Sequence, residues 1–356
     1  MVKKMDLAGL ELAALEAQLE SRGLPRFRAR QIFRWIHHRG VTDIAAMTDL
    51  PLELRTSLAE SFTLTTPTLA AREKSSDGTE KFLLRLDDGK QIESVFIPDT
   101  PAMTFCISTQ VGCAMACSFC LTGKMGLVRN LTAGEIVGQV RVLVDALAMR
   151  DTRFNIVLMG MGEPLHNYDE TMSALRILAD DQGLEVSPRR VTLSTVGLLP
   201  ALERLAKEPL MPNLAISLHA PTDAVRGELV PINKKYGIAD IIAACRKFPL
   251  KKRSRITFEY VLLAGVNDSA AQARTLAKLL ANVKAKVNLI PLNAAPGIRF
   301  ERPSDAAVDR FAQILADHHI LVSVRKSRGR DIRAACGQLI VEGQKKSPAQ
   351  QLAGIL

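Results

Sequence analysis

Residues 106–120 read CISTQVGCAMACSFC and hold four of the six cysteines of this 356-residue chain. Cys113, Cys117 and Cys120 follow the spacing C-x3-C-x2-C, and Cys106 stands upstream of them. Three clustered thiols are an odd number for disulfides and one ligand short of a closed zinc site. Thiolates also hold iron–sulfur clusters, and three of them leave one iron of a four-iron cubane open. The spacing therefore favours a 4Fe–4S cluster.

A four-thiolate zinc site that recruits Cys106 is the competing interpretation. Structural zinc usually draws two close pairs of ligands, and only Cys117 and Cys120 have that short spacing here. Cys106 also falls within a predicted strand. Plain buried cysteines are the third interpretation of the loop, and Cys245 is interpreted as a structural thiol on an apolar helical face.

The cysteine loop follows the first of several predicted strands, and predicted helices separate most of them. Such alternation indicates an α/β fold with a parallel sheet. Six or seven strands are too few for a complete eight-stranded barrel, so we expect a partial (β/α)6-type parallel barrel or a doubly wound sheet. Strands are predicted at 102–108, 154–160, 190–195, 213–219, 255–263, 286–292 and 320–325, and helices at 132–149, 168–180, 268–281 and 304–317. Thr132, followed three residues later by Glu135, is a capping-box signature that predicts the start of the first of these helices.

Polar and glycine-rich strings stand at the ends of these strands. The carboxyl ends of parallel strands meet at one edge, where α/β proteins place their sites. The sequence therefore predicts an active-site mouth at that edge. The strings are the cysteine loop, MGMGEPLH (159–166), STVG (194–197), SLHA (217–220) and PLNAAPG (291–297).

Four segments are expected along the chain. Residues 1–65 are predicted to form a helical accessory domain, and its string PRFRARQIFRWIHHRG is either a solvated helix face or an RNA contact. Residues 66–100 are predicted to form a linker with a β-hairpin that turns at Asp87, Asp88 and Gly89. Residues 101–340 form the core and the loop of Cys336, and 341–356 form a tail.

The composition indicates a globular protein with a polyanionic partner. Hydrophobic residues make up 47% and charged residues 24% of the chain, and the net charge is +10. The sequence has neither a signal-peptide pattern nor an apolar stretch of about 18 residues, so no membrane association is expected. Crowded cysteines fit the reducing cytoplasm.

The exact strings resemble one family. CISTQVGCAMACSFC, NLTAGEIVGQV, MGMGEPL, LSTVG, ISLHA and DIRAACGQL are similar to those of the RNA adenine carbon-2 methyltransferases (RlmN type) of the radical S-adenosylmethionine (SAM) superfamily. That family modifies 23S ribosomal RNA and transfer RNA. The resemblance implies a 4Fe–4S cluster, SAM, and a reduced flavodoxin- or ferredoxin-type electron donor. We expect a monomer.

The resemblance also implies roles for individual residues. Cys113, Cys117 and Cys120 would ligate the cluster, and SAM would occupy the open iron and be cleaved to a 5′-deoxyadenosyl radical. For several of the SAM contacts a purely structural role is the alternative. The family's SAM contacts fall on Gly162, Glu163, Ser194, Ser217, Leu218, His219 and Asn293.

The implied mechanism consumes two SAM molecules per turnover. Cys336 would take a methyl group from the first, and the radical from the second would abstract hydrogen from that methyl group. The methylene radical would then add to adenine carbon 2 as a covalent protein–RNA adduct. Glu93 matches the family's proton acceptor, and Cys106 its resolving cysteine, which would release the product as a Cys106–Cys336 disulfide. Without the resemblance, Glu93 is an exposed strand residue and Cys336 a buried thiol.

Alternatives and departures remain. The sister branch that methylates adenine carbon 8 shares both cysteines, and a zinc-stabilised RNA-binding protein is a non-catalytic alternative. Arg333 stands where the family more often has Asp, and PLNAAPG lacks the bulkier residues common after its Asn, which leaves substrate choice open. A basic run before Cys336 is either a solvated surface or a phosphate contact. The run comprises Arg325, Lys326, Arg328, Arg330 and Arg333.

Overall fold

The computed structural model describes residues 4–98 and 102–341, so the predicted tail lies outside the described residues apart from Val341. Seven parallel strands form most of one ten-stranded sheet. All seven fall at the predicted positions. They are β6 (Thr104–Cys106), β9 (Asn155–Leu158), β10 (Val191–Thr195), β11 (Asn213–Ser217), β12 (Ile256–Leu262), β13 (Ala285–Pro291) and β14 (Leu321–Val324).

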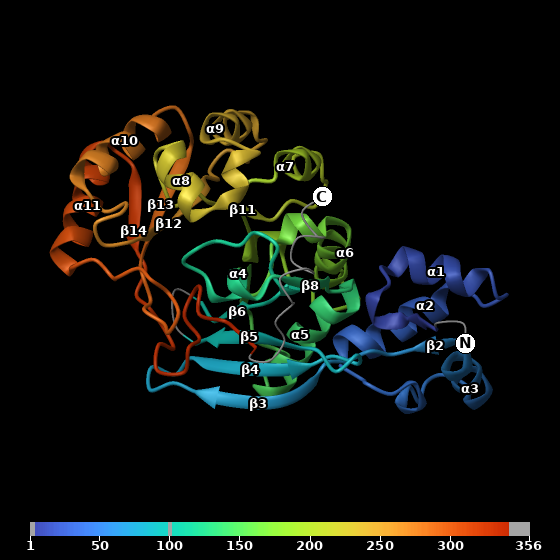
Figure 1. Cartoon of the computed structure of the whole chain (residues 1–356). Helices are drawn as coiled ribbons and strands as arrows, with labels where there is room; N and C mark the ends of the chain where they lie inside the picture. The colour runs from blue at the N-terminus through green and yellow to red at the C-terminus, as the bar shows by residue number, and fades with distance from the viewer. Residues whose placement is uncertain (1–3, 99–101, 342–356) are drawn as a thin grey trace.

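The parallel strands are neighbours in chain order, from β6 to β14, and among the described residues β14 pairs only with β13. The sheet therefore stays open, as the prediction of a partial barrel required. Helices cover its outer side (Figure 1). They are α5 (Ala133–Ala146), α6 (Tyr168–Ala179), α7 (Leu199–Leu205), α8 (Asp223–Leu229), α9 (Ile238–Lys247), α10 (Ala270–Leu280) and α11 (Asp305–Asp317).

Local sequence explains these elements well. The strand β12 reads ITFEYVL and is buried at six of its seven positions, because a strand covered on both faces needs apolar residues throughout. The helix α5 begins at the predicted capping box, in which Thr132 accepts from the amide of Glu135 and the Glu135 carboxylate accepts from the amide of Thr132. This cap fixes where the chain leaves the cysteine loop.

Three antiparallel strands extend the sheet beyond β6. They are β3 (Thr68–Lys74), β4 (Glu80–Arg85) and β5 (Gln91–Ile97), in the order β6-β5-β4-β3. The strands β4 and β5 pair around the predicted turn at Asp87, Asp88 and Gly89. The predicted linker thus continues the main sheet.

The N-terminal region is helical, with α1 (Leu12–Glu20), α2 (Arg26–Phe33) and α3 (Leu52–Ser61), and two short strands, β1 (Met5–Asp6) and β2 (Phe62–Thr63), pair with each other. His37 in this region is buried. It is 1% exposed, and its ring packs on Phe33 with 4.4 Å between ring centroids. Several surrounding Arg residues, including Arg26, Arg30 and Arg34, are exposed.

The chain after β14 crosses from the parallel strands to the antiparallel extension and back to the cysteine loop (Figure 1). Asp331 accepts from Ser75 and from the amide of Ser76 in the turn between β3 and β4. Asp77 in that turn accepts from the amide of Gly329 at 2.9 Å. We call residues 325–341 the Cys336 loop.

Candidate active site

The cysteine loop is held between a short antiparallel pair, β7 (Gln110–Gly112) and β8 (Leu127–Asn130), and the helix α4 (Leu121–Met125). Gly112 has φ +76°, and a Cβ there would stand 1.9 Å from the carbonyl oxygen of Gly126. Only glycine allows this approach. The amide of Cys113 donates to the same carbonyl at 3.0 Å. Gly112 therefore sets the direction in which the loop departs.

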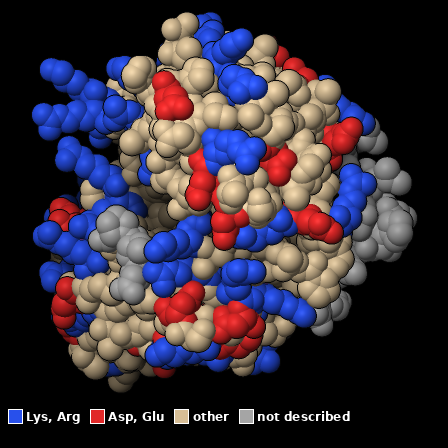
Figure 2. Space-filling model, turned by 90° about the vertical axis from the view of Figure 1, so that its left-hand side faces the viewer, with Lys and Arg blue, Asp and Glu red and all other residues tan. Residues whose placement is uncertain are grey.

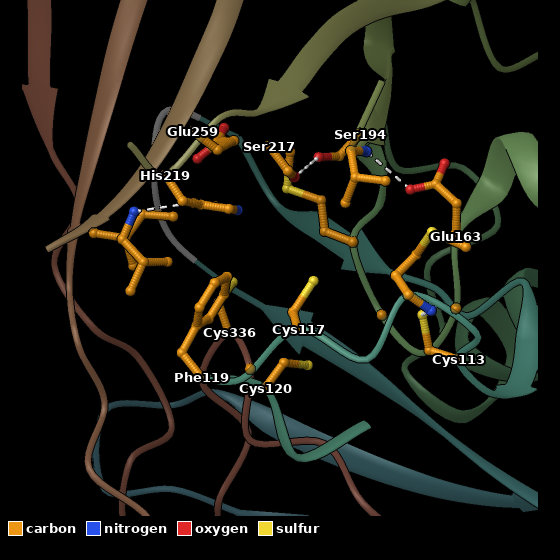
Figure 3. A pocket seen from close by; sticks show the side chains of 18 of the residues that line it. Cys113, Cys117, Phe119, Cys120, Glu163, Ser194, Ser217, His219, Glu259 and Cys336 are labelled. Atoms are coloured by element: carbon orange, nitrogen blue, oxygen red, sulfur yellow. Dashed lines mark hydrogen bonds between the residues drawn. The ribbon is translucent and has the colours of Figure 1, made fainter. Parts of the chain in front are cut away.

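Most of the predicted site residues at the carboxyl ends of the strands line one cavity. It has a volume of about 150 Å³ and opens to solvent. Cys336 joins the three loop cysteines in its wall, and Figure 3 shows their side chains on the opposite side of the view from Ser194 and Ser217. Other lining residues that the sequence predicted are Gly162, Glu163, His219 and Asn293.

The chemistry of the three loop thiols fits a metal cluster. Burial raises the pKa values of Cys113, Cys117 and Cys120 above the ordinary value of 9.0, and neighbouring thiols add to the rise in all three. Three thiolates in one buried loop need a compensating positive centre, which iron supplies. The residues present therefore fit the group.

A zinc site fits less well. Among residues 4–98 and 102–341, no three or more His, Cys, Asp or Glu side chains are arranged to hold a single metal ion. A cubane offers a separate iron to each thiolate, whereas one zinc gathers all its ligands within about 2.3 Å. Cys106, the required fourth zinc ligand, does not line the cavity. The geometry favours the cluster.

Cys106 instead associates with Cys336. It ends β6 and is 6% exposed, and burial raises the pKa of its thiol to about 12, with the Cys336 thiol adding to the rise. The guanidinium of Arg325 opposes that rise. The four cysteines of the 106–120 string thus divide into three cavity-lining thiols and one, outside that lining, whose pKa the Cys336 thiol raises.

Glu163 lies at the floor of the cavity, 3% exposed. Its carboxylate accepts from the amides of Leu165 at 3.0 Å and Val196 at 2.9 Å. Burial raises its pKa to about 7. A cationic amine bound in the cavity would therefore stabilise its ionised form.

Gly162, before Glu163, has φ +107°, and a Cβ there would stand 2.7 Å from the Cβ of Gln110. Ser194 and Ser217, on neighbouring strands, share a hydrogen bond of 3.1 Å between their hydroxyls. Each hydroxyl keeps further hydrogen-bonding capacity. These groups form a polar wall.

His219 is neutral and oriented. Its Nδ1 accepts from the amide of Val261 at 3.1 Å, so Nε2 carries the proton and is a donor. Burial, aided by the nearby guanidinium of Arg226, lowers its pKa to about 3. Its ring meets Phe119 edge-on with 4.7 Å between centroids. His219 therefore offers one fixed donor.

Two predicted SAM contacts differ in their surroundings. Asn293 lines the cavity, donates to the carbonyl of Cys336 at 3.4 Å, and has a buried Oδ1 without a partner among the described residues. That oxygen is a free acceptor for a ligand. Leu218 is 0% exposed and lies in the hydrophobic core, and its carbonyl already accepts from Arg226.

Glu93 lines a neighbouring cavity, of about 430 Å³, rather than the one that contains the three loop cysteines. It is 4% exposed, unlike a typical charged strand residue. Its carboxylate accepts from the amide of Ile340, in the Cys336 loop, at 2.8 Å. The structure thus places Glu93 next to the Cys336 loop but across it from the main cavity.

Sequence reasoning missed three charged residues at the site. Glu259 on β12 lines the cavity and accepts from Asn288 at 2.7 Å. Arg226 is 0% exposed and joins the loops after β10 and β11 by donating to the carbonyls of Val196 and Ser217. Arg325, predicted as part of a surface run, instead lines the cavity. Local pattern gives no signal for these three.

The surface carries an excess of basic side chains. Figure 2 shows Lys and Arg on several sides of a hollow in one face of the molecule. In the Cys336 loop, Lys326 and Arg330 are exposed, as a phosphate contact requires. No helix in the described part of the chain is long and apolar enough to cross a membrane.

Two family models match the sequence. The model of the radical SAM superfamily matches residues 107–276, which span the cysteine loop and the strands β9 to β12. The model of the ribosomal RNA large subunit methyltransferase N-terminal domain matches residues 5–64, which include the helices α1 to α3.

Individual relatives cover nearly the whole chain. The dual-specificity RNA methyltransferase RlmN of Geobacter sulfurreducens is 51% identical over 335 residues, which are 94% of this chain and 92% of that protein. The protein of that name from Anaeromyxobacter dehalogenans is 48% identical over 99% of this chain and 96% of its own. A crystal structure of a radical SAM methyltransferase from Sphaerobacter thermophilus has a TM-score of 0.89 and 50% identity, with 94% of this chain and 99% of that chain covered.

Proposed function

This chain belongs to the RlmN family of dual-specificity RNA methyltransferases, and from that premise we propose how its own residues methylate RNA. The enzyme is a SAM-dependent RNA methyltransferase of the radical SAM type that acts on adenine carbon 2 in ribosomal and transfer RNA. One observation carries the assignment of residues: Cys336 and the three loop cysteines line one cavity, while Cys106 lies outside its lining but near enough to Cys336 for the two thiols to interact electrostatically.

Cys113, Cys117 and Cys120 hold the 4Fe–4S cluster. Bound there with SAM, the cluster supplies the 5′-deoxyadenosyl radical that the reaction needs. Glu163 accepts from the methionyl ammonium, and the free Oδ1 of Asn293 accepts from another donor of SAM. Ser194, Ser217 and the Nε2 proton of His219 complete a polar surround, and Leu218 contributes packing behind it.

Cys336 carries the transferred carbon. Its thiolate takes a methyl group from a first SAM and becomes S-methylcysteine. After hydrogen abstraction, the methylene radical bonds to carbon 2 of the adenine. The adduct then loses the proton of carbon 2 and one electron, which the oxidised cluster would take back, and Cys336 and the RNA are left joined in a closed-shell covalent adduct. The cavity encloses both parts of this chemistry, because Cys336 and the cluster ligands share its wall.

Cys106 releases the product. Its Sγ attacks the Sγ of Cys336, a disulfide forms, and the bond between the sulfur of Cys336 and the methylene carbon breaks. The carbon keeps that electron pair and takes a proton to become the methyl group. Burial keeps the Cys106 thiol protonated beforehand, which protects it until the adduct forms.

Glu93 accepts the proton that leaves carbon 2. Its position beside Ile340 supports this role, because the adduct stands on the same short loop. Proton transfer requires the carboxylate to come within about 3 Å of its target or to act through one water. We propose that the Cys336 loop shifts toward Glu93 once the adduct has formed.

The exposed Lys326 and Arg330, with the Arg residues of α2, bind RNA phosphates. The target adenine leaves its stack to reach the cavity. A reduced flavodoxin- or ferredoxin-type protein supplies electrons to a monomeric enzyme in the cytoplasm, where its RNA substrates are found.

Mass spectrometry of nuclease-digested RNA tests the function. Ribosomal and transfer RNA that lack the modification are incubated with the reconstituted enzyme, SAM and reductant. We expect 2-methyladenosine in the digest. Methylation at carbon 8, or no methylation while 5′-deoxyadenosine forms, would contradict the proposed function.

A further inference from the structure

Three charged side chains form a line across the antiparallel strands beneath the Cys336 loop. The ammonium of Lys81, on β4, lies 3.2 Å from the carboxylate of Glu93 on β5. It also lies 3.2 Å from the carboxylate of Glu73 on β3. Lys81 therefore bridges the proposed proton acceptor and a second carboxylate.

The strand register explains this arrangement. Glu73 pairs directly with Lys81, and Lys81 pairs with Val95. Glu93 is two residues from Val95 and so lies on the same face, diagonal to Lys81. The line follows from the pairing of the sheet rather than from flexible side chains meeting at the surface.

Exposure increases along the line. The side chains of Glu93 and Lys81 are 6% and 10% exposed, whereas that of Glu73 is 51% exposed. The line thus leads from the interior beside the Cys336 loop to bulk water. Salt bridges at the surface contribute about 0–1 kcal/mol to stability, so the outer pair is not needed for the fold alone.

The three side chains line the 430 Å³ cavity between the sheet and the Cys336 loop. Its other charged lining groups are Asp331 and Arg333. A cavity with this many polar groups has room and partners for ordered water. Protons can therefore move between the side chains directly or through water.

Lys81 also favours the ionised form of Glu93. Burial raises the pKa of Glu93 and so favours its protonated form, which cannot accept a further proton. The ammonium of Lys81 and the amide of Ile340 both lower that pKa. Glu73 adds to the rise in pKa. A general base must be ionised before it acts, so an adjacent cation matters here.

We propose that Lys81 is a positioning residue that keeps Glu93 ionised and, with Glu73, forms the exit for the proton that Glu93 accepts. When Glu93 is protonated, Lys81 gives one proton to Glu73 and takes the proton of Glu93. Glu93 is a carboxylate again, Lys81 is again an ammonium, and Glu73 passes the proton to water. The inference rests on the proposed role of Glu93 as proton acceptor.

The test is a single-turnover experiment on the reconstituted enzyme with RNA. Acid quenching followed by a denaturing gel measures how fast the covalent protein–RNA adduct disappears. Because removal of a positioned acid–base partner costs on the order of tenfold or more, we expect K81M to slow adduct release about tenfold while 5′-deoxyadenosine forms at the normal rate. K81R keeps the charge and should restore most of the rate.

The pH dependence separates this role from a structural one. Without Lys81, Glu93 ionises at higher pH, so the rate of adduct release by K81M should reach its half-maximum about one pH unit higher than in the wild type. K74M is the matched control, because Lys74 is on the same strand as Glu73 but on the opposite face of the sheet, with a 70% exposed side chain and a 3.7 Å ion pair to Glu80. It should behave as wild type.

A double variant tests the line itself. E73Q should slow adduct release about fivefold, and K81M/E73Q should be no slower than K81M, because groups on one path are not additive. Strictly additive effects, or a K81M profile that coincides with the wild-type profile, would overturn the inference. E93Q separates the proposed exit path from the proposed role of Glu93. If E93Q accumulates adduct and K81M does not, only the exit path is wrong. If E93Q releases product at the normal rate, the role of Glu93 as proton acceptor is wrong.

Discussion

The amide of Leu121 donates to the carbonyl of Gly337 at 2.8 Å. Leu121 directly follows Cys120, the last of the proposed cluster ligands, and Gly337 directly follows Cys336. Two segments more than 200 residues apart are thus joined beside these cysteines, and the hydroxyl of Thr122 strengthens the joint by donating to the carbonyl of Leu339 at 2.6 Å. The joint therefore positions Cys336 relative to the cysteine loop before an adduct forms.

T122V tests this joint. Valine keeps the shape of threonine but loses the hydroxyl, so a buried carbonyl loses its donor. We expect a loss of about 1–2 kcal/mol in the free energy of unfolding and slower methylation of Cys336. Chemical denaturation measures the first effect. T275V removes an exposed hydroxyl that donates to Ala271 at 3.0 Å and should change stability little, and equal effects of the two variants would contradict the prediction.

C106A should trap the enzyme on its RNA. Without the attacking thiol, the bond between Cys336 and the methylated base persists, so a protein–RNA band should accumulate on a denaturing gel while free methylated RNA falls at least about tenfold. C245A is the matched control, since Cys245 is a buried thiol on α9, far from the cavity lining. Normal release of product by C106A would disprove its resolving role.

G162A should damage SAM binding more than the fold. A Cβ at Gly162 meets Gln110 at 2.7 Å, and φ +107° is strained for alanine. Gly265 also has a positive φ, +68°, but nothing lies within 4 Å of its Cβ position. We expect G265A to cost about 1 kcal/mol of stability and to bind SAM normally, and G162A to lose SAM affinity at least about tenfold in equilibrium titrations. Similar SAM affinities would argue against the close approach at Gly162.

His37 makes the stability of the N-terminal region depend on pH. Burial, with a contribution from the guanidinium of Arg141, lowers the pKa of His37 well below the ordinary value of 6.5. The burial of neutral His37 makes its full contribution to stability above pH 6.5. As the pH falls below 6.5, the free energy of unfolding decreases by up to about 1.4 kcal/mol per pH unit. Denaturation between pH 7.5 and 5 should therefore show a shallower decline for H37F. H38F changes an exposed neighbour and should keep the wild-type slope; a wild-type slope in H37F would refute the prediction.

Signals that act over a few residues were sufficient to predict the strands, the capping box at Thr132 and the placement of Cys113, Cys117 and Cys120 in one loop. Strand periodicity, cap chemistry and ligand spacing are local properties, so the sequence carries them directly. The strings that follow the strands also meet at one cavity, because parallel strands end at a common edge.

Contacts between distant segments explain what could not be predicted. Glu93 belongs to an antiparallel strand that pairs with β4, and only that pairing brings Lys81 beside it. Arg325 sits in a basic run, yet it is the member that turns into the cavity. His37 becomes buried because the N-terminal helices pack on the core. Each depends on tertiary neighbours that no short pattern encodes.

Peptide mass spectrometry of Cys336 tests the central claim most directly. The reconstituted enzyme is incubated with SAM whose methyl group carries deuterium, without RNA, and the peptide that contains Cys336 is compared with the peptide that contains Cys245. We predict one labelled methyl group on Cys336 and none on Cys245. An unmodified Cys336 in enzyme that holds its cluster and cleaves SAM would contradict the account.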